Sequence, residues 1–253
     1  MDIVEKAIKL LQDNEPSEGY HLAFSGGKDS IVIKEITRLS GVKHKSHFAR
    51  TSIDPPELLD YIHEYHPDVI WHRPELTMYQ LILKNKMPPL RTARYCCKYL
   101  KEYLGNGEFV VTGIRAKESV RRSQREQIET SYNKKKKFIH PIFHWTDLSV
   151  WSFIRNNNLP YCSLYDEGFL RIGCIGCPML TEKQSLYMFN RYPKHKRAYI
   201  KTFEKMMPTY KHKDNYENAE DLFNQWISNL NVAQWKEQKN QTKLEMECLP
   251  EQS

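Results

Sequence analysis

Long apolar runs are missing from this sequence. No stretch of its 253 residues approaches the roughly 18–20 apolar residues that a helix needs to cross a bilayer. The segment from Met1 to Glu15 is amphipathic and lacks the basic start, apolar centre and small-residue cleavage site of a signal peptide. We therefore expect a cytoplasmic protein without a membrane partner.

Cysteine is also scarce, and its use excludes a disulfide framework in the expected reducing compartment. Six cysteines in such a compartment are more typical of metal ligands or reactive thiols. A chain of this length can bury a full hydrophobic core without cross-links. The cysteines are therefore candidate metal ligands or nucleophiles.

Acidic residues are fewer than basic ones, and the formal net charge of +7 suits an anionic ligand. A phosphate-rich small molecule and a nucleic acid both fit this balance. Part of the excess is local, because residues 121–140 hold seven basic and two acidic side chains, including the run Lys134–Lys137. The stretch 121–137 is either a surface for nucleic acid or a solvated loop.

Short apolar runs alternate with helical patterns as far as Ile154. The expected strands are 20–24, 47–49, 69–71, 109–113 and 138–143, and the expected helices are 29–39, one from Pro56, 78–83, 92–104 and 146–154. This alternation predicts an α/β fold with a parallel sheet, whose ligands bind beyond the carboxyl ends of the strands.

The character of the chain changes after Pro178. Residues 183–207 and 218–235 have helical patterns and no strand signal. We therefore expect an α/β nucleotide-binding domain over 1–180, followed by a helical appendage and tail over 181–253.

A glycine-rich segment directly follows the first expected strand and opens the first helix after it. Its six residues are Ser25, Gly26, Gly27, Lys28, Asp29 and Ser30. The glycines let backbone amides approach an oxyanion, and the helix start adds a partial positive charge. The spacing is too short for a Walker A loop. We predict a phosphate-binding loop, the alternative being a turn that only joins strand to helix.

A second group of polar residues follows the strand expected at 109–113. Gly113 ends this strand, and Arg115, Lys117 and Arg122 come after it. These cations can surround a phosphate or sulfate with charge-assisted donors, unless they are surface charges at the start of a helix.

On these two segments the sequence resembles the PP-loop superfamily, and within it the phosphoadenosine phosphosulfate (PAPS) and adenosine phosphosulfate (APS) reductases. The resemblance runs from about Tyr20 to Pro178. It implies a Rossmann-like adenine nucleotide alpha hydrolase fold with a C-terminal helical appendage. It also implies an adenine nucleotide substrate, which is APS, PAPS or ATP, with magnesium as a candidate companion ion.

The resemblance also assigns nucleotide-binding residues. It brings Gly113, Arg115 and Ser119, together with Lys117 and Arg122, to the nucleotide and its sulfate. A looser match places Thr51 and Asp54 beside the adenosine.

Four of the cysteines suit a thiolate site. Cys96 and Cys97 are adjacent, and Cys174 and Cys177 form a Cys-x-x-Cys pair. Four thiolates bind zinc or an iron–sulfur cluster, and zinc more often takes two Cys-x-x-Cys pairs. The pattern resembles the iron–sulfur branch of the reductase family, which implies a 4Fe–4S cluster. Cys162 is expected to pack in the core.

Cys248 decides between two reactions. The reductases attack sulfate with a cysteine in Glu-Cys-Gly-(Ile or Leu)-His, whereas this chain has Glu247-Cys248-Leu249-Pro250. The position fits but the glycine and histidine are absent, so Cys248 is either the catalytic nucleophile or an inert thiol.

Two functions follow. The first is a reductase that converts activated sulfate to sulfite, with a thioredoxin-like reductant as partner. The second is an ATP-pyrophosphatase-type sulfurtransferase that modifies a nucleic acid, similar to DNA phosphorothioation or tRNA thiolation enzymes, with the polyanion held by residues 121–137.

Overall fold

A mixed sheet organises the first part of the chain. The structure is a computed structural model that describes residues 2–131 and 135–247. The six strands are β1 (Tyr20–Ala23), β2 (His44–Ala49), β3 (Ile70–His72), β4 (Phe109–Val111), β5 (Ile128–Thr130) and β6 (Lys137–Ile139). They lie in the order β3-β2-β1-β4-β6-β5, and every neighbouring pair is parallel except β5 with β6. The predicted α/β fold with a parallel sheet is confirmed.

The antiparallel edge strand β5 was not expected. It has only three residues, and two of them, Glu129 and Thr130, are polar. Its register pairs Ile128 with Ile139 and Thr130 with Lys137. So short and polar a segment carries no apolar periodicity from which to predict a strand.

Local capping explains where the helices beside the sheet begin and end. They are α1 (Ile3–Asp13), α2 (Lys28–Ser40), α3 (Pro56–Tyr65), α6 (Val120–Ser123) and α7 (Asp147–Asn156). Asp2 and Glu5 form a capping box on α1, and Thr146 caps α7 as predicted. Gly41 ends α2 in the left-handed conformation that glycine adopts without strain.

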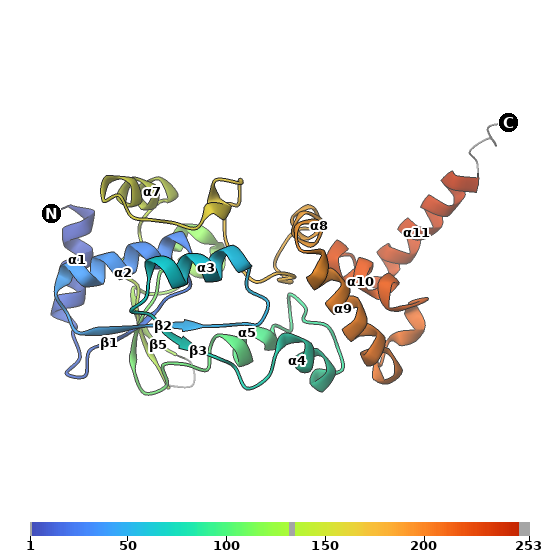
Figure 1. The fold of residues 1–253 in the computed structure, drawn as a ribbon, viewed down its shortest axis with the longest axis horizontal. Coiled ribbons are helices and arrows are strands. Elements are labelled where there is room, and N and C mark those ends of the chain that lie inside the picture. Colours follow the sequence, from blue (N-terminus) through green and yellow to red (C-terminus); the bar gives the residue numbers. More distant parts are fainter. Residues whose placement is uncertain (1, 132–134, 248–253) are drawn as a thin grey trace. The chain divides into compact units, whose positions relative to one another are not determined.

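The core of this part lies between the sheet and helices α1, α2 and α7. Helix α2 contacts both α1 and α7, and the three helices lie along the same side of the sheet (Figure 1). Leu22 of β1 and Val111 of β4 belong to one buried cluster with Ile33 and Ile36 of α2. The core therefore holds the carboxyl ends of β1 and β4 against the start of α2.

The chain divides into two compact units, and their boundaries differ from the domain boundary expected after residue 180. The first unit contains residues 1–75 and 98–173, and the second contains 76–97 and 174–253. Helix α5 (Tyr95–Leu100) spans one division. The segment 76–97, expected in the nucleotide-binding domain, thus belongs with the C-terminal helices.

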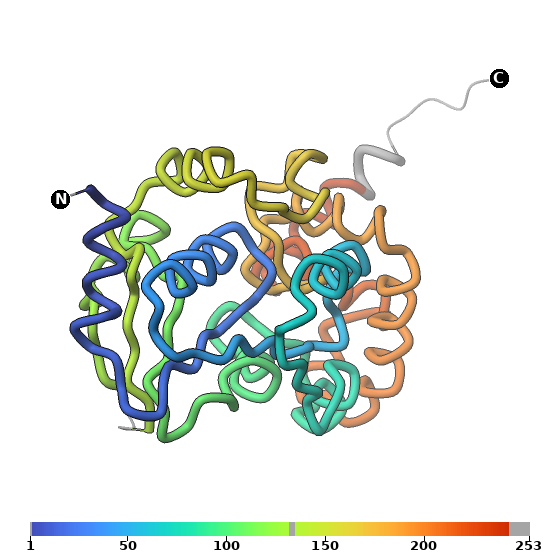
Figure 2. Tube along the Cα trace, turned by 60° about the vertical axis from the view of Figure 1, so that its left-hand side comes forward, coloured from blue at the N-terminus to red at the C-terminus, as the bar shows by residue number. Residues whose placement is uncertain are grey.

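Aromatic side chains form the core of the second unit. Its helices are α4 (Met78–Asn85), α8 (Glu182–Arg191), α9 (Pro193–Met206), α10 (Ala219–Ser228) and α11 (Val232–Glu247). Although α4 and α9 are far apart in the sequence, they lie in contact (Figures 1 and 2). Phe189, Tyr199, Phe203 and Trp226 pack ring against ring, and the indole of Trp226 donates to the carbonyl of Pro89 at 2.7 Å.

The two segments with helical patterns, 183–207 and 218–235, are each divided by a helix end. Pro193 begins α9, so residues 183–207 form two helices, because a proline interior to a helix removes a hydrogen bond. Asn229 has a positive φ of 62° and ends α10, which divides the expected helix 218–235. Among the described residues no helix combines the length and apolar character required to span a membrane.

Candidate functional site

The carboxyl ends of β1 and β4 meet where the strand order reverses. β1 pairs with β2 on one side and with β4 on the other. The segment Ser25–Ser30 follows β1, and Gly113 follows β4. A Cβ atom at Gly113 would lie 3.0 Å from the backbone of Asp29, so the two segments are in close contact. In parallel sheets this reversal point is where ligands bind.

The two glycines of the loop have different surroundings. Gly26 has a φ of +72°, and a Cβ atom there would lie 2.6 Å from Leu58 and 2.8 Å from Ile62. Gly27 has an ordinary φ of −81° and caps α2, and its nearest neighbour to an added Cβ is the hydroxyl of Tyr165 at 3.4 Å. Gly26 is therefore required by the fold, whereas Gly27 leaves space beside the helix start.

Backbone and hydroxyl groups converge on the start of α2. Ser25 Oγ donates to Ser30 Oγ at 3.2 Å, and Ser30 Oγ donates to the carbonyl of Gly27 at 2.8 Å. The backbone N–H of Lys28 donates to the hydroxyl of Tyr165 at 2.8 Å. An amide at a helix start that already contacts an oxygen is well oriented to contact an oxygen of a phosphate.

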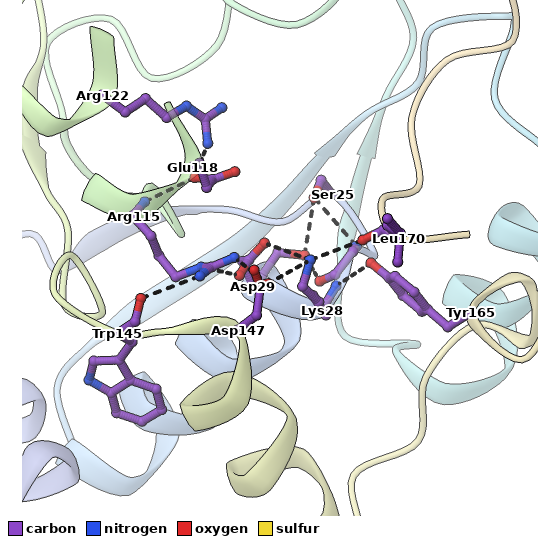
Figure 3. A network of polar contacts seen from close by, with 12 residues as sticks. Ser25, Lys28, Asp29, Arg115, Glu118, Arg122, Trp145, Asp147, Tyr165 and Leu170 are labelled. Atoms are coloured by element: carbon purple, nitrogen blue, oxygen red, sulfur yellow. Dashed lines mark hydrogen bonds and ion pairs between the residues drawn. The ribbon is translucent and has the colours of Figure 1, made fainter. Parts of the chain in front are cut away.

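A network of charged side chains lies beside this helix start (Figure 3). Arg115 is only 2% exposed, and it donates to Asp29 Oδ1 at 2.7 Å and to Asp147 Oδ1 at 2.8 Å. The ammonium of Lys28 lies 3.4 Å from the same oxygen of Asp147 and donates to the carbonyl of Leu170 at 3.1 Å. Arg115 is thus engaged with two carboxylates of the protein.

The pKa values of the two carboxylates, Asp29 and Asp147, are shifted in opposite directions. Burial raises the pKa of Asp29, and the charges of Lys28 and Arg115 only partly offset this effect. Burial also acts upward on the pKa of Asp147, but Arg115 and Lys28 lower it below its usual range. The difference follows exposure, since the Asp147 side chain is 69% exposed and that of Asp29 is 22% exposed.

Asp147 and Tyr165 were missed as site residues. Asp147 directly follows Thr146, the predicted helix cap, so an acidic residue there looked like ordinary helix-start chemistry. Its second role depends on Arg115, which is distant in the sequence. No local signal marks Tyr165 as a partner of the Lys28 amide.

Thr51 and Asp54 pair with each other after β2. The N–H of Thr51 donates to Asp54 Oδ2 at 2.6 Å, and its hydroxyl donates to Asp54 Oδ1 at 2.7 Å. Thr51 is fully buried and Asp54 is 7% exposed. This closed turn satisfies both side chains, and their contact with an adenosine stays a prediction.

The residues after Gly113 form a short capped turn. Ser119 caps α6 by accepting the N–H of Arg122 at 3.3 Å. The guanidinium of Arg122 pairs with Glu118, whose carboxylate also accepts the N–H of Arg115 at 3.0 Å. Lys117 is exposed. Lys117, Arg121 and the partly exposed Arg122 are therefore the cations of this turn that face solvent.

Much of the basic stretch that follows is engaged within the fold. Arg125 pairs with Glu129, and the ammonium of Lys136 donates to two backbone carbonyls. The ammonium of Lys137 lies 4.4 Å from the centre of an aromatic ring. Lys134 lies outside the described residues. These contacts reduce the number of side chains in the stretch that are free to bind a polyanion.

The four candidate metal ligands belong to the same unit. Cys96 and Cys97 lie in the segment 76–97, and Cys174 and Cys177 in the segment from 174 onward. A hydrogen bond with Cys97, burial, and the charges of Cys97, Cys174 and Cys177 raise the pKa of Cys96. The four thiols are therefore electrostatic neighbours.

Zinc and a 4Fe–4S cluster require different arrangements of the four thiols. Among residues 2–131 and 135–247, no group of three or more His, Cys, Asp or Glu side chains is arranged to hold a metal ion. Four cysteines bind a 4Fe–4S cluster through separate irons, so they need not converge on one point as the ligands of a single zinc ion do. The binding of a cluster or of zinc by these four cysteines stays a prediction.

The turn between Cys174 and Cys177 rests on aromatic rings. Gly176 has a φ of +72°, and a Cβ atom there would lie 2.9 Å from Phe189 and 3.0 Å from Tyr199. The hydroxyl of Tyr199 donates to the carbonyl of Ile175 at 3.1 Å. Packing thus fixes the turn that carries two of the thiols.

The remaining two cysteines are Cys162 and Cys248. Cys162 is fully buried in the hydrophobic core, as expected of a packing residue. Cys248, the predicted nucleophile, lies outside the described residues.

Comparison with known families gives one match over most of the chain. The family model of the phosphoadenosine phosphosulfate reductase domain matches residues 19–180. These residues include the loop after β1, the turn after β4 and all four candidate cysteine ligands.

Two individual relatives are a named reductase and an uncharacterised protein. An adenosine 5'-phosphosulfate reductase of Oceanobacillus iheyensis is 32% identical over 189 residues, which are 70% of this chain and 79% of the relative. An uncharacterised protein of Methanocaldococcus jannaschii is 29% identical over 231 residues, which are 86% of this chain and 46% of that protein. The chain thus spans about half the length of the latter relative.

A solved structure shows a similar fold. The PAPS reductase of Candida auris, in a phosphate complex, aligns with a TM-score of 0.52 and 19% sequence identity. The alignment covers 69% of this chain and 88% of that chain.

Proposed function

The chain belongs to the phosphoadenosine phosphosulfate reductase family, and from this premise we propose that it binds APS or PAPS and reduces the activated sulfate to sulfite. Its parallel sheet is the PP-loop nucleotide-binding fold of that family. The relatives named as APS reductases support this substrate class.

One observation carries the proposal, namely the glycine-rich helix start at the reversal point of the sheet. Gly27 leaves space beside the first amides of α2, and the hydroxyl of Tyr165 already contacts the amide of Lys28. In the proposal, a phosphate oxygen of the nucleotide lies near the first amides of α2, as the hydroxyl of Tyr165 does. The hydroxyls of Ser25 and Ser30 are further donors to the phosphate.

The cations of the site divide into two roles in this proposal. Arg115 acts through Asp29 and Asp147, which hold it, and fixes the start of α2 against the turn after β4. Lys117 and Arg122 meet the sulfate, because they lie on that turn and face solvent. Thr51 and Asp54 border the adenosine.

Cys248 supplies the nucleophile in the proposed reaction. Its thiolate attacks the sulfur of APS, the sulfur–oxygen bond to the phosphate breaks, and S-sulfocysteine and AMP form. A thioredoxin-like dithiol then attacks the Cys248 sulfur and releases sulfite, supplying two electrons as it becomes a disulfide. With PAPS the nucleotide released is adenosine 3',5'-bisphosphate.

Cys96, Cys97, Cys174 and Cys177 hold a 4Fe–4S cluster in this proposal. Their electrostatic proximity within one unit supports it. The cluster supplies a localised charge that tunes the electrostatics of the protein, and the electrons for sulfate come from the dithiol.

The alternative function is an ATP-dependent sulfurtransferase that modifies a nucleic acid. It uses the same loop for ATP, with magnesium as the companion ion, and releases pyrophosphate instead of sulfite. The Leu249-Pro250 sequence, in place of the glycine of the reductase motif, favours it.

Product analysis separates the two functions. Anaerobically purified protein is incubated with APS, PAPS or ATP and a dithiol reductant, and sulfite and pyrophosphate are measured separately. The proposal predicts sulfite from APS or PAPS and no pyrophosphate from ATP. Pyrophosphate from ATP without sulfite would replace it by the alternative.

A further inference from the structure

Helix α9 has two opposite faces of different chemistry. Tyr199, Phe203 and Met206 are buried and pack in the aromatic core of the second unit. Basic side chains spaced three, four and four residues apart are all exposed on the opposite face. They are Lys194, Arg197, Lys201 and Lys205, and we name them the α9 stripe.

The geometry of an α-helix aligns these four residues. Spacings of three and four residues return to the same side of a helix with about 3.6 residues per turn. The stripe is about 16 Å long, at about 1.5 Å of rise per residue. Helix α9, labelled in Figure 1, therefore carries a row of four cations on its exposed face.

The four side chains of the stripe all carry a positive charge. None of its four side chains forms an ion pair with a side chain that the structure describes, unlike Arg122 and Arg125 in the other unit. The helix contains one acidic residue, Glu204. Solvated helix faces ordinarily mix both signs.

This arrangement costs the helix stability. Arg197 with Lys201, and Lys201 with Lys205, are like-charged pairs four residues apart, which repel one another on a helix surface. A helix face that only contacts water does not need like-charged pairs. A face that binds a polyanion does benefit from them, because each cation can contact a negative charge of the partner. We propose that the α9 stripe binds the phosphate backbone of a double-stranded nucleic acid.

The chemistry of the helix favours this partner over a membrane or an acidic protein. A membrane-surface helix needs a free apolar face, but the apolar face of α9 is buried. A protein interface is anchored by buried aromatic or apolar residues, and the stripe itself has none. A duplex carries one charge per about 1.7 Å of its axis, so several phosphates come within reach of the stripe.

Fluorescence anisotropy with a labelled DNA duplex of about 24 base pairs tests the proposal across about 50–200 mM salt. The stripe variant replaces all four residues by glutamine, which keeps the helix propensity of lysine and arginine. The matched control replaces three exposed lysines and one exposed arginine of the first unit. These changes are Lys6→Gln, Lys43→Gln, Lys45→Gln and Arg73→Gln.

Four phosphate contacts predict a slope of log affinity against log salt of about −3 to −4 for the wild type. The stripe variant should lose at least about tenfold in affinity at about 100 mM salt, and most of the slope. The control has the same net charge as the stripe variant, but it should bind the duplex as tightly as the wild type does. Circular dichroism checks that both variants keep their helices.

Two results would overturn the proposal. One is a stripe variant that binds the duplex as tightly as the wild type, or no more weakly than the control. The other is equal competition by polyglutamate of matched charge, which would identify an acidic protein as the partner. The sulfite assay is independent of both, since none of these residues belongs to the nucleotide loop.

Discussion

Gly26 and Gly27 differ in what an added methyl group would meet. For Gly27→Ala we expect at least a tenfold loss of affinity for APS, because the methyl group enters the space beside the first amides of α2. Its free energy of unfolding should stay within about 1 kcal/mol of the wild type, since the φ of −81° suits alanine. Calorimetric titration and urea denaturation measure the two quantities.

Gly26→Ala is the matched control for this prediction. Its positive φ and its contacts with Leu58 and Ile62 should lower the free energy of unfolding by about 2 kcal/mol or more. If Gly27→Ala binds the nucleotide as the wild type does, the loop is a structural turn and the proposed phosphate site is wrong.

His66 makes the stability of the protein sensitive to acid. Burial, together with the charge of Lys34, lowers the pKa of His66 to about 4. The ammonium of Lys34 donates to Nδ1 at 3.1 Å, so a proton on that nitrogen would face a cation. Between pH 6.5 and about 4 the unfolded chain binds a proton that the folded chain does not, so this contribution is complete above pH 6.5 and is lost as the pH falls.

We therefore expect the free energy of unfolding to fall below pH 6.5, by at most about 1.4 kcal/mol per pH unit for this histidine. Urea denaturation at several pH values measures the slope, and His66→Gln should reduce it by that amount. The remaining slope comes from His47 and His140, whose pKa values burial also lowers to about 4. An unchanged slope in the variant would show that His66 is not the responsible group.

Site residues that belong to a continuous motif could be predicted, whereas contacts between residues far apart in the sequence could not. The loop from Ser25 to Ser30 is a continuous motif between a strand and a helix, so its position follows from neighbouring residues. The partners of Arg115 are Asp29 and Asp147, which only the folded sheet brings together. The sequence therefore indicates the charges of the site but not that Arg115 is used internally.

At the scale of elements, apolar periodicity predicts the central strands and most helices. It fails where a single residue ends a helix, as at Pro193 and Asn229, since the periodic pattern continues across both. It also misses β5, whose pairing with β6 is a tertiary feature. The boundaries of units depend on such contacts as well.

The cysteine segments give a prediction at this scale. Protein purified without oxygen should contain about four irons per chain and absorb near 400 nm if the four thiols hold a 4Fe–4S cluster. Replacing any one of Cys96, Cys97, Cys174 or Cys177 by serine should remove most of the iron, whereas Cys162→Ala should keep it. Iron analysis and absorption spectroscopy measure this, and stoichiometric zinc in a colourless, active protein would contradict it.

At the scale of the whole molecule, the chain separates into a unit that contains the sheet and a helical unit. Residues 76–97 return from the first part of the sequence to join the C-terminal helices, which brings all four cysteines into one unit. The sequence spacing predicts the donors, but it does not predict this exchange of a segment. The helical unit thereby carries both the proposed cluster and the α9 stripe.

The central claim is that a thiol of this chain attacks activated sulfate bound at the loop after β1. Mass spectrometry of protein incubated with APS or PAPS, without any reductant, tests it most directly. The account predicts a peptide containing Cys248 that carries the added mass of sulfite, no adduct in Cys248→Ser, and a reduced yield in Gly27→Ala. Sulfite release by Cys248→Ser at the rate of the wild type, with no adduct on any cysteine, would contradict it.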